Sequence, residues 1–316
     1  MKTVNEAAAW LMERDHFLIL THRRPDGDAV GSAIALCLGL RSLGKDAMIW
    51  KNPQFTKRYE KRLEGLCTES CTEESTVISV DLASEGLLPI NGADFAGKIL
   101  LSLDHHPSNT GYAKETLTLS KCAGCGELIW DLLEYLDVEI TVPMAEAVYI
   151  AISTDTGGFC YANTTAHTFQ TAAKAVEYGA QIAPINREHF EIKSRGRLQL
   201  EARLMTSMEF YGNGTVAVAC LPQSWIEELG VTEDDLDSIS GFPRTIEGVK
   251  VGVMVRDSEP GKAKLSVRTQ EGFNASAYCG RLGGGGHAAA AGASVPGTLE
   301  DGKQAILAIL REERVI

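Results

Sequence analysis

Aspartate and histidine side chains are concentrated at four places in this sequence. In chain order these residues are His22, Asp26 and Asp28; Asp81; Asp104, His105 and His106; and Asp155. Taken singly, an aspartate after a strand is typical of a turn or a helix cap, and a lone histidine is typical of a satisfied surface or core group. The combination of at least four carboxylates with two or three imidazoles indicates a shared chemical site.

Divalent cations are the partners that such a set of side chains favours. Carboxylates gathered without a cation would repel one another and raise each other's pKa. Aspartate and histidine ligands without cysteine suit Mn²⁺, Mg²⁺ or Zn²⁺, and the imidazoles favour Mn²⁺ over Mg²⁺. Two metals about 3.5–4 Å apart form the usual clamp for phosphoester hydrolysis. A carboxylate such as Asp81 could bridge them.

A run of glycines near the C-terminus is a second candidate binding feature. It comprises Gly283, Gly284, Gly285 and Gly286, and it is followed by His287. Consecutive glycines let the backbone approach a ligand closely and point its N–H groups at an anion. The alternative is a flexible hairpin or linker, against which the small residues 288–291 weigh. Arg268 ends a predicted strand nearby and can supply a fixed charge to a phosphate; its alternative is an exposed arginine.

The elements that must position the first set alternate between strand and helix. Predicted strands lie at 17–21, 47–50, 77–80 and 99–103, and predicted helices at 29–43, 125–136, 143–153 and 165–178. This alternation predicts an α/β fold, a doubly wound and mostly parallel sheet with helices on both faces. Ligands of such sheets bind at the carboxyl ends of the strands. We therefore expect His22, Asp81, Asp104 and Asp155 to meet at one edge.

The 316 residues favour two domains. We predict a catalytic, metal-binding domain over 1–185, a charged helical linker over 186–211, and a smaller α+β substrate-binding domain over 212–316. In the last part, strands are predicted at 215–221, 249–255 and 263–267, and helices at 222–240, 272–281 and 298–311.

Composition and charge exclude several classes of protein. The net charge of −12 argues against a protein that grips duplex nucleic acid, although it allows small phosphate ligands held by local cations or metals. No apolar run is long enough to span a membrane, and no secretory signal is present, so we expect a cytoplasmic protein without a membrane partner. Cys122 and Cys125 form the single C-x-x-C pair. Reduced, buried thiols are favoured over structural zinc, and the role of the pair is open.

Together these motifs resemble those of the DHH phosphoesterase family, in the subfamily that carries a C-terminal DHHA1 domain. The resemblance lies in His22-x3-Asp26-x-Asp28 with Ala29-Val30-Gly31-Ser32, in Asp81, in the triplet Asp104-His105-His106, in Asp155, and in the glycine run with His287 and Ala290-Ala291-Gly292. One departure is Ser266-Val267-Arg268-Thr269, where many relatives have Ser-Leu-Arg-Ser.

The resemblance implies a role for each motif residue. One metal would be held by His22, Asp26 and Asp81, and the other by Asp28, Asp81, His105 and Asp155. His106 would lie against the scissile phosphate, and Asp104 would orient its neighbours. Arg268, His287 and the backbone of Gly284, Gly285 and Gly286 would receive the substrate's phosphate from the other side of a cleft.

The resemblance also implies an activity. Compact members hydrolyse very short RNA (nano-RNA) to mononucleotides and often convert 3′-phosphoadenosine 5′-phosphate to AMP, with water activated between two Mn²⁺ ions. Mg²⁺ or Co²⁺ are substitutes, and the partners are short single-stranded RNA or small nucleotides. The alternatives are a phosphodiesterase for pApA or cyclic di-AMP in dinucleotide signalling, an inorganic pyrophosphatase, and a non-catalytic nucleotide-binding or metal-storage module. Substrate preference, polarity of attack, the metal and the oligomeric state stay open, with a homodimer among the options.

Overall fold

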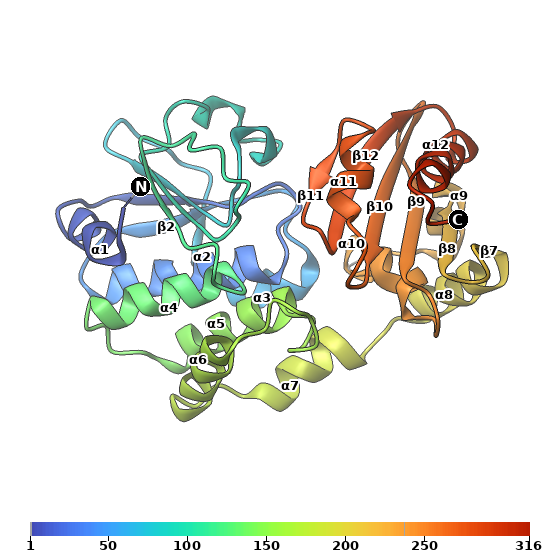
Figure 1. Cartoon of the computed structure of the whole chain (residues 1–316). Helices are drawn as coiled ribbons and strands as arrows, with labels where there is room; N and C mark the ends of the chain where they lie inside the picture. The colour runs from blue at the N-terminus through green and yellow to red at the C-terminus, as the bar shows by residue number, and fades with distance from the viewer. Residues whose placement is uncertain (1, 237) are drawn as a thin grey trace. The chain divides into compact units, whose positions relative to one another are not determined.

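The computed structural model describes residues 2–236 and 238–316. The chain forms two compact units, Met1–Ile192 and Lys193–Ile316, each with its own sheet (Figure 1). This confirms the predicted fold class, a mostly parallel α/β unit followed by a smaller α+β unit. None of the described helices combines the length and apolar composition that a membrane-spanning helix requires.

The first unit is built on a six-stranded sheet whose strands all run parallel. Its strands are β1 (Phe17–Leu20), β2 (Ala47–Trp50), β3 (Cys67–Thr68), β4 (Thr76–Val80), β5 (Leu101–Asp104) and β6 (Glu115–Thr118). The order β3-β2-β1-β4-β5-β6 reverses direction between β1 and β4. In open parallel sheets, such a switch point opens a crevice at the carboxyl ends of the two strands. The four predicted strands are present, whereas the short strands β3 and β6 were not predicted.

Helices cover one face of this sheet. They are α1 (Val4–Met12), α2 (Gly27–Ser42), α4 (Cys125–Tyr135), α5 (Val142–Asp155) and α6 (Ala166–Glu177). The strand residues Phe17, Ile19 and Ile78 share a core with these helices. Helix α2 lies against α5 so closely that a Cβ at Gly31 would be 2.2 Å from the carbonyl oxygen of Ala147. Glycine is therefore required at this point of the helix pair.

The opposite face differs from the prediction of helices on both sides. Leu18, Leu20 and Val77 point to this face and pack with residues of the segment 82–100. That segment forms only the short 3₁₀ turns η2 (Glu85–Leu87) and η3 (Ala93–Phe95). Its proline and its three glycines, at 86, 92 and 97, oppose a regular helix.

The segment predicted as one helical linker, 186–211, is divided between the units. Helix α7 (Ile182–Asn186) and the π-helical turn η4 (Arg187–Glu191) belong to the first unit, together with η1 (Lys57–Tyr59) and α3 (Glu60–Leu63). Arg62 of α3 donates to the Glu188 carboxylate at 2.7 Å and so ties η4 to this unit. Helix α8 (Arg195–Ser207) starts anew in the second unit, where the Ser194 hydroxyl caps it by accepting from the Arg197 N–H.

The second unit contains a mixed six-stranded sheet in the order β11-β12-β10-β9-β8-β7. Its strands are β7 (Glu209–Tyr211), β8 (Val216–Leu221), β9 (Val251–Glu259), β10 (Lys262–Thr269), β11 (Gly285–Gly286) and β12 (Ala290–Pro296). Only the pair β8–β9 is parallel among the described pairs. Strands β11 and β12 were not predicted, because glycine and alanine carry little strand signal.

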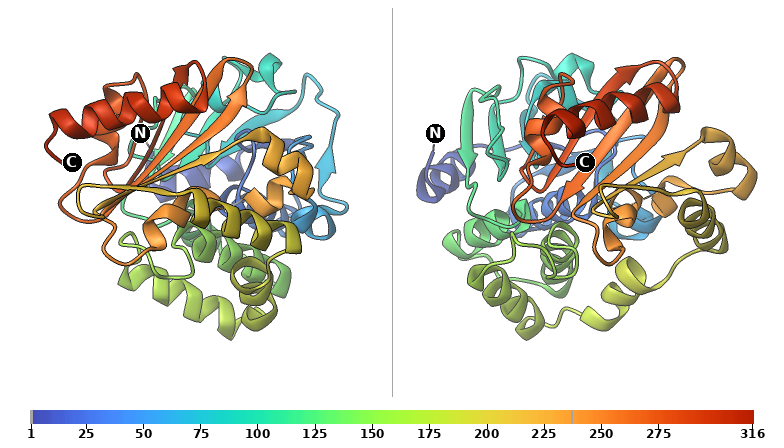
Figure 2. Two further views of the ribbon diagram at one scale, coloured as in Figure 1. Left: turned by 90° about the vertical axis from the view of Figure 1, so that its right-hand side faces the viewer. Right: turned by 45° about the vertical axis from the view of Figure 1, so that its right-hand side comes forward.

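Helices pack on both faces of the second sheet. Helices α11 (Ala275–Gly280) and α12 (Leu299–Glu312) cover one face, and α8 with α9 (Gln223–Leu229) and η5 (Ile239–Thr245) covers the other (Figure 2). The predicted helix 222–240 is broken into α9, α10 (Glu233–Leu236) and the start of η5. Gly230, at φ +61°, ends α9 in the left-handed conformation that favours glycine. Residue 237 of that prediction lies outside the described residues.

Candidate metal centre

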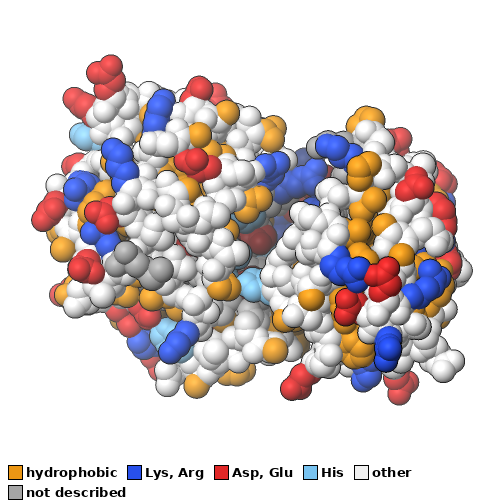
Figure 3. All heavy atoms as spheres, turned by 45° about the horizontal axis from the view of Figure 1, so that its top comes forward, with side chains coloured by type: hydrophobic (Ala, Val, Ile, Leu, Met, Phe, Trp, Pro, Cys, Tyr) orange, Lys and Arg blue, Asp and Glu red, His pale blue; other side chains and the backbone are white. Residues whose placement is uncertain are grey.

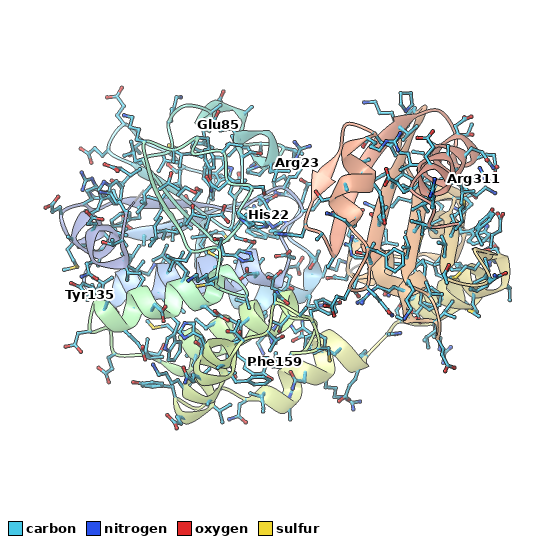
Figure 4. All side chains as sticks on the ribbon, in the orientation of Figure 1. His22, Arg23, Glu85, Tyr135, Phe159 and Arg311 are labelled. Atoms are coloured by element: carbon cyan, nitrogen blue, oxygen red, sulfur yellow. The ribbon has the colours of Figure 1, made fainter. Side chains whose placement is uncertain are left out.

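The predicted metal-binding side chains meet at the carboxyl edge of the first sheet. His22 follows β1 and Asp81 follows β4, on the two sides of the switch point. Asp26 caps α2, Asp28 lies in its first turn, and Asp155 ends α5. Figure 4 shows His22 at the edge where β1 ends, whereas Tyr135 marks the far end of α4. The expected convergence is therefore present in the structure.

These side chains form overlapping groups, each with ligand atoms within 4.8 Å of one another. The groups are His22, Asp26 and Asp81; Asp28, His105 and Asp155; and Asp81, His105 and His106. Asp81 joins them, because its Oδ2 lies 3.5 Å from His22 Nε2 and its Oδ1 lies 3.5 Å from His105 Nε2. One oxygen of Asp81 thus faces His22 and the other faces His105, which belongs to both of the remaining groups, and this is the arrangement that a bridging carboxylate needs.

Asp81 is the carboxylate of the cluster whose surroundings most clearly favour a bound cation. Its side chain is 3% exposed, and its Oδ1 has no hydrogen-bond donor among the described residues. A buried carboxylate oxygen without a donor is costly. The backbone of Asp81 also adopts φ +53°, an uncommon conformation that recurs at functional sites. The donor set, oxygen and imidazole without thiolate, therefore fits a hard or borderline divalent cation.

The electrostatics of the cluster lead to the same conclusion. Burial, and then the neighbouring Asp81 carboxylate, raises the pKa of Asp28 well above its usual value. Burial, together with Asp26 and Asp81, raises the pKa of Asp155 in the same way. His22 is partly buried, and this desolvation would lower its pKa, but Asp26 and Asp81 outweigh the effect and raise the pKa. The site therefore carries more negative charge than its own residues neutralise.

Two of the histidines are oriented as metal ligands. The Nδ1 of His22 lies 2.7 Å from the carbonyl oxygen of Arg23, and the Nδ1 of His105 lies 3.3 Å from that of Cys122. A carbonyl only accepts, so each Nδ1 carries the hydrogen and each Nε2 is left toward the carboxylates. Such backbone contacts fix the tautomer and the ring orientation of a ligating histidine.

His106 and Asp104 form a separate pair at the same edge. The Nδ1 of His106 donates to Asp104 Oδ1 at 2.8 Å. Burial alone would lower the pKa of His106, but Asp104 and Asp81 raise it to about 9. Asp104 itself is fully buried and also accepts the N–H groups of residues 105 and 106 and the Asn109 amide, the last at 2.6 Å. Asp104 is thus saturated by donors and orients His106.

Several groups that hold the site were not predicted from the sequence. Asp28 accepts the backbone N–H groups of Cys125 and Gly126, at 2.6 and 2.9 Å, where α4 begins. A Cβ at Gly124 would lie 3.0 Å from the Asp28 carboxylate, so the small residues of Cys122-Ala-Gly-Cys125 let the chain pass close by. The Asn163 amide donates to the backbone carbonyl of Asp155 at 3.2 Å. The glycines beside Cys125 were the one signal available for these contacts.

The remaining predicted residues lie together in the second unit. Arg268 on β10 pairs with Ala290 of β12, and β12 pairs in turn with Gly285 and Gly286 of β11. His287 lies in the connecting turn and donates its N–H to the carbonyl of Ala290 at 2.8 Å. The Arg268 guanidinium donates to Ser240 Oγ at 3.0 Å, a contact that the sequence did not indicate. The glycine run is therefore part of a paired hairpin.

Family models match both units. The model of the DHH family N-terminal domain matches residues 16–152, and the model of the DHHA1 domain matches residues 213–313. Two curated relatives carry the name bifunctional oligoribonuclease and PAP phosphatase NrnA. The protein from Thermus thermophilus is 31% identical over 301 residues, covering 93% of this chain and 89% of the relative. The Bacillus subtilis protein is 25% identical over 288 residues, covering 89% of this chain and 90% of the relative.

The fold also matches that of a solved structure. The crystal structure of an exopolyphosphatase-related protein from Bacteroides fragilis superposes with a TM-score of 0.86. The match covers 98% of this chain and 95% of that protein, at 21% sequence identity. At this identity the likeness describes the fold, and it extends through both sheets.

Proposed function

This chain belongs to the DHH family and carries a DHHA1 domain, and from that membership we propose that it is a metal-dependent phosphoesterase. It hydrolyses short oligoribonucleotides to mononucleotides and 3′-phosphoadenosine 5′-phosphate to AMP. The observation that carries the proposal is the two-sided use of Asp81, which faces His22 with one oxygen and His105 with the other. The names of the two curated relatives support the choice of substrates.

We assign two Mn²⁺ ions to the cluster, for which Mg²⁺ or Co²⁺ can substitute. His22, Asp26 and Asp81 hold one ion, and Asp28, Asp81, His105 and Asp155 hold the other. Bound cations of this kind supply Lewis acidity, which makes a water molecule nucleophilic at neutral pH and offsets charge on a phosphoryl group.

His106 supplies positive charge for the reacting phosphoryl group. In the cation-free site, Asp104 and Asp81 raise its pKa to about 9 against the effect of burial, which favours the protonated imidazole. Asp104 holds the proton on Nδ1, so the proton on Nε2 is the one that we assign to a phosphoryl oxygen of the substrate. Asn109 keeps Asp104 in place by donating to its other carboxylate oxygen at 2.6 Å.

The DHHA1 unit binds the substrate rather than the metals. Arg268 is held by Ser240 and offers a planar, permanent charge to a phosphate. The hairpin of Gly285 and Gly286 lets the backbone approach the substrate closely, and His287 completes this binding group. The N–H of Gly284, in contrast, is already used, because it donates to the carbonyl of Cys279 at 2.9 Å. The partners are thus short single-stranded RNA and small nucleotides, and a location in the cytoplasm is part of the same proposal.

A substrate panel tests the function. End-labelled RNA from two to about twenty nucleotides is compared with 3′-phosphoadenosine 5′-phosphate, pApA, cyclic di-AMP and pyrophosphate, each with Mn²⁺ and with EDTA. We expect rapid hydrolysis of the shortest RNA and of 3′-phosphoadenosine 5′-phosphate, and none with EDTA, because chelation removes the Lewis acid. Equal rates along the RNA series, or a preference for cyclic di-AMP or pyrophosphate, would contradict the proposal.

A further inference from the structure

Arg24 lies between two of the predicted metal ligands without serving the cluster itself. It is two residues from His22 and two from Asp26, so its Cα lies at most about 7 Å along the chain from either. The side chain is exposed. Its guanidinium makes no hydrogen bond or ion pair with the residues that the structure describes. A permanent cation therefore stands two residues along the chain from two of the predicted metal ligands, with no hydrogen-bond or ion-pair partner among the described residues.

The backbone on both sides of Arg24 is fixed. The Arg23 N–H donates to the carbonyl of Leu87 at 2.7 Å, and the Arg23 guanidinium donates to the carbonyl of Gly86. Asp26 is held as the cap of α2 by the N–H groups of Asp28 and Ala29. Figure 4 shows Arg23 beside His22 at this edge. The two arginines therefore differ. The Arg23 side chain holds the loop by its hydrogen bond to Gly86, whereas the Arg24 side chain is exposed on the same loop.

Arg24 also occupies an unfavourable backbone conformation. Its φ is +51°, in the left-handed region that glycine and asparagine adopt more readily than arginine. Asp81, at φ +53°, is the other residue of the site in this region. Strained positions of this kind persist where the surroundings impose them, and they cluster at ligand-binding sites. Arg314 of the second unit has the same backbone conformation at φ +57° without belonging to the cluster, so this conformation fixes the place of Arg24 and other observations must give it a role.

The charges around Arg24 indicate such a role. The chain carries a net charge of −12, and the cluster beside Arg24 contains four aspartates. Acidic and basic side chains are both present on the face that Figure 3 shows, and the net charge is negative, so the overall charge does not attract a polyanion. A substrate with two phosphates brings one to the metals, and the other can be contacted by a cation of the first unit in addition to Arg268 of the second. Arginine suits this task because its planar fork binds phosphate bidentately.

We propose that Arg24 binds the phosphate that is not hydrolysed, and that it thereby selects nucleotides with a terminal phosphate over those without one. This inference rests on the proposed function, because it assumes a phosphoester at the metal centre. It assigns a specificity residue within the first unit, separate from Arg268.

The test compares two dinucleotides that differ in one phosphate. The dinucleotide pApA carries a 5′-phosphate and ApA does not. In the variant Arg24→Asn, the preference for pApA over ApA in kcat/KM should fall roughly tenfold, the usual scale of a lost charge-assisted contact. Arg24→Lys should keep part of the preference, since it retains charge without the fork. High salt should shrink the wild-type preference, because the contact is exposed.

Arg314→Asn is the matched control. Arg314 is an exposed arginine at φ +57°, it belongs to the second unit, and its guanidinium likewise has no partner among the described residues. Asparagine suits the backbone at both positions, so both variants should fold with an unchanged or raised melting temperature. The control should leave the preference for pApA unchanged.

The outcomes separate the two proposals. An equal loss of kcat/KM on pApA and ApA in Arg24→Asn would overturn the assignment, as would an equal change in the Arg314→Asn control. Calorimetric binding of both dinucleotides to the Mn²⁺-loaded proteins is measured in parallel. A wild-type chain that binds pApA more tightly than ApA without turnover would refute the proposed function, while the variant would still report on Arg24.

Discussion

The two units of this protein bury charged side chains in opposite ways. In the first unit the buried charged residues are Asp28, Asp81, Asp104, His105 and Glu127, an excess of carboxylates over cations. In the described part of the second unit, only Arg197 and Lys303 are buried, and both are paired. Arg197 donates to Glu201 at 2.8 Å, and Lys303 donates to Glu209 at 2.7 Å. The first unit therefore leaves an excess of buried carboxylates that bound cations would offset, whereas the buried cations of the second are paired within the unit.

This difference requires different structural support in the two units. Buried charges without partners cost several kcal/mol each, so a fold keeps them only where the surrounding structure is well supported. In the first unit that support comes from the close packing of α2 on α5 and from the core beneath the sheet. The second unit instead has a glycine run at its edge strand β11. There the constraint is steric, because the backbone of Gly284 lies too close to that of Gly292 for a larger side chain.

The largest effect is expected from Asp81→Asn. The substitution keeps the size of the side chain and suits φ +53°, but it removes the charge shared by the two groups of ligands. We expect kcat/KM to fall by roughly 10³-fold, beyond the 10–100-fold range of residues that only orient ligands. Bound metal is measured by mass spectrometry alongside turnover. Asp301→Asn, in the second unit, is the control for the loss of an acidic side chain. Near wild-type turnover in Asp81→Asn would contradict the contrast between the two units.

A smaller effect separates two neighbouring glycines of the second unit. A Cβ at Gly284 would lie 2.1 Å from the carbonyl oxygen of Gly292, whereas a Cβ at Gly285 would meet nothing within 4 Å. Gly284→Ala should therefore lower the free energy of unfolding by about 2 kcal/mol or more, and Gly285→Ala by less than about 0.5 kcal/mol. Chemical denaturation measures both. Equal losses would show that the run is not held against β12 as described.

The smallest effect concerns pH and the cation. Burial and neighbouring carboxylates raise the pKa of Asp28 and Asp155, and Asp104 raises that of His106 to about 9 against the effect of burial. Groups with raised values bind protons more tightly in the folded state, so the cation-free protein should lose stability as the pH rises from about 5 to about 9. Burial would raise the pKa of Asp104, but the hydrogen bonds from His106 and Asn109 lower it. Asp104 therefore does not contribute to the change in stability between about pH 5 and about pH 9.

Mn²⁺ should reverse part of this loss. The ion competes with protons for the same side chains, so the melting temperature should rise more with Mn²⁺ at about pH 8 than at about pH 6, by a difference of roughly 1 kcal/mol in stability. Thermal unfolding with Mn²⁺ or EDTA measures this, and hydrogen exchange locates it. Protection confined to peptides around His22, Asp81 and His105 is expected. Protection spread equally over the second unit would contradict the contrast between the units.

Much of the candidate site follows from local patterns in the chain. The apolar strands at 17–21, 77–80 and 99–103 are each followed by aspartate or histidine, and parallel strands bring such positions to one edge. The groups that orient the ligands do not follow in this way. The carbonyl of Cys122 and the amides of Cys125 and Gly126 belong to the backbone, which every residue has, so no residue type marks them.

The limits of the fold prediction have similar physical causes. The short strands β3 and β11 contain two residues each, too few for an alternating pattern. The helical character of 186–211 is real over most of its length, but its division at 192–194 depends on which unit each half packs against. Arg62 and Glu188, whose hydrogen bond holds the first half, are 126 residues apart, so no local sequence pattern predicts their contact.

The amino-acid sequence alone was sufficient to specify the α/β and α+β units, the identity of the acidic and imidazole groups, and their place after particular strands, because strand and helix periods and turn residues act over a few neighbours. Only the folded chain supplied the distances: each oxygen of Asp81 lies 3.5 Å from a different histidine, Asp104 accepts from His106 and Asn109, and Arg24 has no hydrogen-bond or ion-pair partner among the described residues. Those outcomes depend on distances between segments brought together by packing, which short-range patterns do not encode.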